Sequence, residues 1–220
     1  MTQTKVEAPF VEGVGGGFKN VIINGDMQIF QRATSATTLP SSGYSTVDRF
    51  GFSEGSGGAA TSELDNLSVT DQATTGQTRA LELNCTSADT SIAAGEFLTI
   101  DYRIEGQDLQ AFKKGETNAE YYTLAFYAKA DAAVTYGIEL RDHDNGRHIT
   151  STFTTGTDWT HHVISFPGDT TGNFSDDNGE SLRIRLWLHA GSTYNGGTAP
   201  TSWASQSNAN SVSSSNGSFF

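Results

Sequence analysis

Cysteine is nearly absent from this chain, which has one thiol, Cys85, in 220 residues. An intramolecular disulfide is therefore excluded. Cys85 ends an alternating segment that begins at Arg79. Because a free cysteine in such a position behaves as a small hydrophobe, we expect a buried thiol there rather than a nucleophile.

Positive charge is also scarce. The chain has 13 lysines and arginines against 25 aspartates and glutamates, which gives a formal net charge of -12. Such a surface repels phosphate backbones and lacks the clustered basic residues that nucleic-acid binding requires. We therefore expect no nucleic acid among the partners of this protein.

Long apolar runs are missing as well. The first residues, MTQTKVEAPFVEG, contain neither the basic region nor the apolar stretch of a signal peptide. No run elsewhere approaches the length of a membrane-spanning helix. We expect no membrane insertion, and assembly inside a cell without secretion by the usual route.

The chain does contain many glycines, 24 in all, and many short segments in which apolar and polar residues alternate. This alternation is typical of half-buried antiparallel strands. Asn145-Gly146 supplies the positive φ angles of a tight hairpin turn between two of them. We predict strands over residues 21–23, 27–30, 79–83, 97–104, 122–127, 134–140, 148–153, 159–166 and 182–188.

One short helix is predicted over residues 105–113. Leu109 and Phe112 share a face there, and Lys113-Lys114-Gly115 matches a helix C-terminus. Many short strands with almost no helix predict an all-β fold, namely a jelly-roll β-sandwich.

Most of the sequence motifs that suggest catalysis or metal binding lack their structural context. Gly51-Phe52-Ser53-Glu54-Gly55 matches the G-x-S-x-G nucleophile pattern, but the glycines that follow cannot open the required helix. Residues 142–146 lack the glycine and glutamate spacing of a calcium loop and are predicted to form a hairpin turn. His161 and His162, adjacent on a strand, point to opposite faces and cannot share a metal. We predict no catalytic residue and no enzymatic activity.

The segment over residues 20–50, NVIINGDMQIFQRATSATTLPSSGYSTVDRF, resembles the opening of a family of tailed-bacteriophage virion proteins, mostly tail-fibre or tail-associated. The resemblance rests on four features in order: Asn24-Gly25, Gln31-Arg32, Gly43-Tyr44 and Asp48-Arg49-Phe50. It implies a virion location after assembly in the host cytoplasm, docking to tail or adaptor proteins, and a homotrimer.

Later segments resemble jelly-roll carbohydrate-binding modules of the galactose-binding-like type. They are YYTLAFYAKA, TDWTHHVISFPGDTTGNF and ESLRIRLWLHAGS, within residues 119–192. In these modules calcium often lies near the N-terminal strand, so the resemblance implies a structural Ca²⁺ at Asn24 and Asp26 and no other cofactor. Aromatic rings suit the apolar faces of sugars, and the glycan-contact candidates are Trp203, Tyr194 and Tyr44.

The opening motif is expected to fix loops and pack the first strands rather than to contact a ligand. Arg49 and Arg32 could each pair with Asp26 or with loop carbonyls. The structural residues of the motif are Asn24, Gly25, Asp26, Gln31, Arg32, Tyr44, Asp48 and Arg49.

We divide the chain into three parts. Residues 1–19 form an N-terminal docking arm, in which Pro9, Phe10 and Val11 would bind a partner; the alternative is a disordered terminus. Residues 20–192 form the jelly roll. Residues 193–220, rich in serine and asparagine, are either the start of a truncated last strand or a linker, and we expect a longer protein.

Two functional hypotheses follow. The first is a phage virion structural component, the N-terminal module of a tail fibre or tail-associated protein that docks to the tail and supports host attachment. The alternative is a glycan-binding, lectin-like module that recognises host surface polysaccharide, or a capsid-decoration protein.

Overall fold

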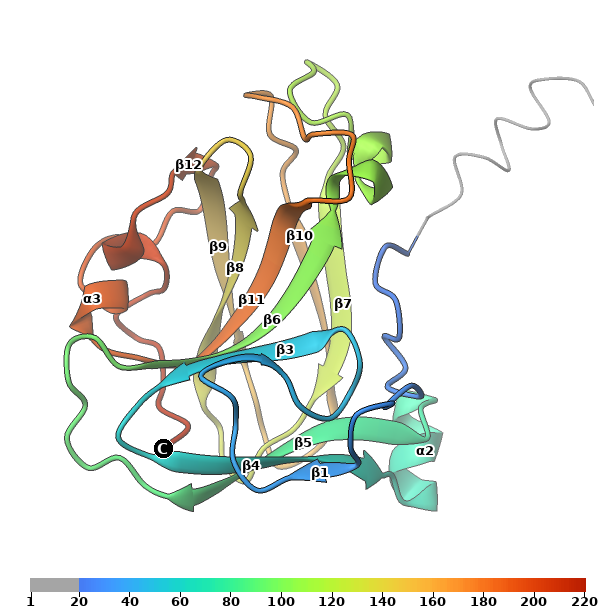
Figure 1. Ribbon diagram of the computed structural model, residues 1–220, viewed down its shortest axis with the longest axis vertical. Coiled ribbons are helices and arrows are strands. Elements are labelled where there is room, and N and C mark those ends of the chain that lie inside the picture. Colours follow the sequence, from blue (N-terminus) through green and yellow to red (C-terminus); the bar gives the residue numbers. More distant parts are fainter. Residues whose placement is uncertain (1–19) are drawn as a thin grey trace, which may run out of the picture.

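The computed structural model describes residues 20–220, and the docking-arm candidates Pro9, Phe10 and Val11 lie outside the described residues. The described chain forms antiparallel sheets that pack in two layers (Figure 1). The larger layer is a seven-stranded sheet in the order β12-β9-β8-β11-β6-β3-β2. Its strands are β2 (Ser42–Tyr44), β3 (Phe50–Gly55), β6 (Phe97–Glu105), β8 (Thr135–Asp142), β9 (Arg147–Thr154), β11 (Glu180–Ala190) and β12 (Ala204–Ser205).

The second layer has two parts. One is the antiparallel pair of β7 (Tyr122–Ala128) and β10 (Thr160–Phe166), which are separated in the chain by β8 and β9. The other is a three-stranded sheet of β1 (Ser35–Ala36), β4 (Ala59–Asn66) and β5 (Arg79–Ser87). Leu124, Phe126 and Ile164 of the β7–β10 pair pack against the apolar face of the seven-stranded sheet, and Leu83 of β5 joins the same core.

The core explains why alternation identified the strands. Leu98, Ile138 and Ile184 lie on neighbouring strands of the large sheet and are all buried in one cluster. Intervening residues point to the opposite face, as the two-residue period of a strand requires. All seven predicted strands from residue 79 onward are present, and the all-β sandwich with a short helical segment is confirmed. Strands β3 and β4 were not predicted, because glycine, serine and threonine weaken their alternation.

The predicted helix at residues 105–113 exists as two consecutive 3-10 turns, η1 (Gly106–Asp108) and η2 (Gln110–Phe112). Leu109 is fully buried, and the Phe112 ring stacks on Tyr122 at 4.6 Å. A β-carbon at Gly106 would lie 1.9 Å from a backbone oxygen of the neighbouring loop, so only glycine fits there. The α-helix α2 (Val69–Thr75), capped by the Ser68 side chain, was not predicted.

The predicted strands at residues 21–23 and 27–30 are wrong. Within the described residues 20–34 the chain forms no strand, and residues 23–26 form a turn with Asn24 at φ 62°. Side chains replace the missing sheet hydrogen bonds. Tyr102 Oη accepts from Ile23 N and donates to Ile23 O, while the Asn24 amide bonds both the N–H and the carbonyl of Ile29.

Residues 193–220 pack back along the large sheet (Figure 1). The segment contains β12 and two short helical turns, α3 (Ser192–Asn195) and η3 (Asn208–Asn210). Val212 is 1% exposed and packs against Trp187 and Gly137. Near the end of the segment, Phe219 N donates to Leu188 O. The segment predicted as a linker or truncated strand therefore contributes side chains to the core. Cys85 was expected to be buried but is exposed, because the last residues of β5 extend beyond the core.

Candidate ligand-binding face

The seven-stranded sheet has a polar face opposite the core, and this face carries the most organised side-chain chemistry in the described chain. Asp101 of β6, Glu139 of β8 and Arg185 of β11 face one another across the strand register. Asp101 is 2% exposed, Arg185 is 8% exposed and Glu139 is fully buried. Buried charges of this kind are stable only when they are paired and hydrogen-bonded.

Asp101 and Arg185 form the central pair of the polar face. Arg185 donates from Nε and Nη2 to the two carboxylate oxygens of Asp101 at 2.8 and 3.1 Å. Ser53 and Thr99 donate to the same carboxylate at 2.9 and 3.0 Å. Burial acts to raise the pKa of Asp101, but the bonds and charge of Arg185 outweigh it and hold that pKa below its usual value. Ser53, the serine of the G-x-S-x-G match, thus lies within a strand and binds a structural carboxylate.

Glu139 organises the neighbouring part of the polar face. Its Oε1 lies 2.8 Å from His148 Nδ1, and its Oε2 accepts from the Trp187 indole at 3.1 Å. His148 is fully buried and Trp187 is 1% exposed. These bonds fix the Trp187 ring on the polar face, where Val212 and Tyr194 pack against it.

A pocket of about 390 Å³ opens over these residues, between the serines at β2–β3 and the C-terminal segment. Arg141, Arg185 and Trp187 form its floor. Among the described residues, no hydrogen bond or ion pair engages the Arg141 guanidinium. Burial lowers the pKa of Arg141, Glu139 opposes this effect, and the charges of Arg185 and Arg183 add to it. The remaining lining residues are Ser41, Ser42, Ser53, Phe97, Tyr194, Asn208 and Ser211.

Of the three aromatic residues predicted to contact glycan, Tyr194 lines this pocket. Its ring is half-buried, packs edge-on against Phe97 at 5.3 Å and lies 5.1 Å from Trp187. Trp203 lies elsewhere: its indole donates to Pro167 O at 2.7 Å and its ring packs edge-on against Tyr122. The structure therefore does not bring Trp203 and Tyr194 into one site.

Tyr44, the third aromatic candidate, lines a different pocket of about 360 Å³ formed by the opening motif. Arg32 lies over the Tyr44 ring at 5.1 Å and pairs with Asp48, which also accepts from Gln31 N at 3.0 Å. The other lining residues are Ile23, Asn24, Ile29, Gln31 and Arg49. The motif thus folds into one hydrogen-bonded unit.

Arg32 and Arg49 were each expected to pair with Asp26 or with loop carbonyls, and neither pairs with Asp26 within residues 20–220. Arg32 pairs with Asp48, and Arg49 lies 3.9 Å from Glu105 while donating to the carbonyl of Arg103 at 3.5 Å. Asn24, proposed with Asp26 as a calcium ligand, donates to the carbonyls of Ile29 and Asp48 at 2.8 and 2.9 Å. These bonds assign Asn24 a structural role; calcium binding there stays a prediction.

The prediction that His161 and His162 point to opposite faces of a strand is confirmed. His161 stacks on Tyr127 at 4.7 Å, whereas His162 packs against Phe126 and Phe153 of the core. Sequence reasoning missed Arg141, Arg185 and Trp187 as pocket residues. The alternation in RIRLWLHA placed Arg185 and Trp187 on one face, but it could not show that this face is partly covered by residues 191–217.

Within residues 20–220, none of the helices has the length and apolar character needed to cross a bilayer. No family model, curated protein or solved structure matches the chain.

Proposed function

We propose that this protein is a structural component of a phage virion, the N-terminal module of a tail-fibre or tail-associated protein that docks to the tail and supports host attachment. The observation that carries this proposal is the resemblance of residues 20–50 to the opening of such proteins. Its geometry is consistent with a structural role, because Asn24, Asp48 and Arg32 bind backbone and one another. Docking would fall to residues 1–19, and a homotrimer is proposed on the same resemblance.

The test is a deletion of residues 1–19 in the phage that encodes this chain. Purified particles are probed for the truncated protein, which is expected to be lost from them. The matched control is Tyr194→Ala in the full chain, which alters the polar-face pocket and should be incorporated normally. If the truncated chain is incorporated as well as the full chain, the docking role is refuted. Labelling on the capsid rather than the tail would favour a decoration protein, and light scattering on the purified chain tests the trimer.

A second function, binding of a host surface glycan, is favoured by the polar-face pocket. Tyr194 offers a ring for an apolar sugar face, while Asn208 and the serines at positions 41 and 42 offer hydrogen-bonding groups. Arg141 adds a guanidinium without a bonded partner among the described residues. Because a guanidinium binds carboxylate with two parallel hydrogen bonds, the preferred ligand would be an acidic glycan.

Glycan-array binding tests this second function. Tyr194→Ala and Arg141→Gln should each abolish the signal for acidic glycans. Tyr44→Ala and Arg32→Gln alter the other pocket and should leave it unchanged. If only Tyr44→Ala and Arg32→Gln lose the signal, the glycan site lies at the opening motif. If all four variants keep the signal, neither pocket binds the glycan. Trp203→Ala is unsuitable, because the ring packs against Tyr122 and its loss would destabilise the fold.

A further inference from the structure

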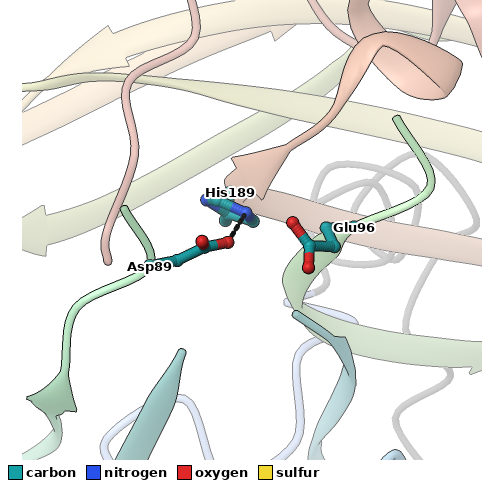
Figure 2. A group of neighbouring side chains, drawn as sticks. All are labelled: Asp89, Glu96 and His189. Carbon is teal, nitrogen blue, oxygen red and sulfur yellow. Dashed lines mark ion pairs between the residues drawn. The ribbon is translucent and has the colours of Figure 1, made fainter. Parts of the chain in front are cut away.

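The side chains of Asp89, Glu96 and His189 point toward one another, and none of the three residues lines either pocket (Figure 2). Asp89 and Glu96 belong to the connection between β5 and β6, and His189 lies near the end of β11. One ligand atom from each residue lies within 4.8 Å of the other two. His189 is fully buried, and the Asp89 side chain is 6% exposed.

Each carboxylate has one oxygen committed to the backbone and a second one available. Asp89 Oδ1 accepts from Ser91 N at 3.0 Å, and Glu96 Oε2 accepts from Ala93 N at 2.5 Å. Asp89 Oδ2 is buried and has no hydrogen-bond partner among the described residues. The backbone bonds orient the two side chains, so that the free oxygens are held in place before any ligand arrives.

The hydrogen bonds around His189 identify its tautomer. Ser218 Oγ lies 2.8 Å from His189 Nδ1 and donates its single proton to Phe220 O at 2.9 Å. The hydroxyl must therefore accept from Nδ1–H, which leaves the lone pair of a neutral imidazole on Nε2. Burial lowers the pKa of His189, and the charges of Asp89, Glu96 and Glu54 only partly oppose this effect.

Two acceptor atoms of the cluster lie close to each other. His189 Nε2 is buried without a partner among the described residues and lies 3.6 Å from Asp89 Oδ2. Two buried acceptors at that distance repel each other unless a proton or a metal cation lies between them. Two ligands of one tetrahedral zinc ion, with bonds of about 2.0–2.1 Å, are roughly 3.3 Å apart, which is close to the separation found here.

We propose that Asp89, Glu96 and His189 form a binding site for a divalent transition metal of the zinc class. One imidazole nitrogen and two carboxylate oxygens are ligands that Zn²⁺ accepts, whereas Ca²⁺ takes six to eight oxygens. The Ser218 hydroxyl holds the imidazole in the ligating tautomer, as partners outside the ligand set commonly do. A bound ion would fasten the β5–β6 connection to β11 next to Phe220, whose ring lies edge-on to His189 at 5.3 Å.

The test is metal binding by the full chain after treatment with a chelator and dialysis. Calorimetric titration with ZnCl₂ is expected to show one ion per chain, and thermal unfolding should move to higher temperature with zinc. Asp89→Asn and Glu96→Gln preserve side-chain shape, and each should weaken zinc binding at least tenfold. The matched control is His143→Gln, which removes a different histidine–carboxylate contact, 3.1 Å from Glu180 and less buried than the one at His189. This control should bind zinc like the wild type.

Several results would overturn the proposal. They are the absence of zinc binding, a response to CaCl₂ alone, unchanged affinity in both carboxylate variants, or an equal loss in His143→Gln. Circular dichroism of each variant separates loss of a ligand from loss of the fold, and two independent carboxylate variants keep the test valid if one fails to fold.

Discussion

At the scale of single residues, this protein buries charges where their partners are fixed. Lys114 is the clearest case: its side chain is fully buried, 2.9 Å from Asp142 and 3.2 Å from Asp169. The carbonyls of Thr171 and Gly172 accept from the same ammonium at 2.6 and 2.9 Å. The sequence suggested only that Lys114 follows a helix C-terminus, because its partners lie far away in the chain.

Lys114→Met is therefore expected to destabilise the protein strongly. Removing the ammonium leaves two buried carboxylates without their shared cation, which should lower the free energy of unfolding by about 3–5 kcal/mol. The adjacent Lys113 pairs with Glu120 at the surface, so Lys113→Met should cost about 1 kcal/mol or less. Urea denaturation of both variants measures the difference. Equal losses would mean that burial of Lys114 does not matter.

Because of the Asp101–Arg185 pair, we expect the stability of the fold to decrease at acidic pH. The pKa of Asp101 is lower in the folded state than its usual value of 3.8, so the unfolded chain binds the proton first as the pH falls. The stabilisation is complete above about pH 4 and is lost as the pH falls below that value. Asp101→Asn cannot titrate, and its thermal midpoint should fall less steeply between about pH 5 and pH 2. The control is Asp131→Asn, at an exposed position. If the thermal midpoint of this control falls with pH as gently as that of Asp101→Asn, the stabilising role of ionised Asp101 is contradicted.

At the scale of elements, the alternation of apolar and polar residues correctly predicted the strands that have one face in the core. It failed at residues 21–30, where hydrogen bonds from side chains replace those of a sheet. The turn at residues 23–26 keeps its backbone bonds through Tyr102, which is distant in sequence, so no local pattern could show it. The polar-face pocket and the Asp89–Glu96–His189 site were missed for the same reason. Arg141 and Tyr194 lie on different elements, as do Asp89 and His189, and only the fold brings them together.

The opening segment should be loosened by Tyr102→Phe. The substitution removes the hydroxyl that bonds both Ile23 N and Ile23 O, at 2.6 and 3.1 Å. We expect a loss of about 1 kcal/mol and faster hydrogen exchange at the Ile23 amide. Tyr122→Phe is a matched control, because the buried Tyr122 hydroxyl has no hydrogen-bond partner within residues 20–220. Slower or unchanged exchange in Tyr102→Phe would show that the segment is held by its apolar contacts alone.

At the scale of the whole molecule, the C-terminal segment is part of the sandwich and not an appendage to it. Val212 covers Trp187, and Phe219 and Phe220 pack against the main core. A β-carbon at Gly137 would lie 2.2 Å from Val212 Cγ2, so the glycine on β8 allows the segment to approach the sheet. Composition suggested a linker or the start of a truncated strand, because most residues of the segment are polar. Its few apolar residues determine where the segment packs.

This arrangement predicts that the segment and the two layers unfold together. Val212→Ala removes buried methyl groups at the contact with Trp187 and should lower the free energy of unfolding by about 1–3 kcal/mol. Tryptophan fluorescence and far-ultraviolet circular dichroism should shift to the same new midpoint, as two-state unfolding requires. Ser214→Ala, at an exposed position of the same segment, should change neither probe. A fluorescence transition that moves alone would mean that the segment detaches before the sandwich unfolds, and the pocket it helps to form would then open independently of the core.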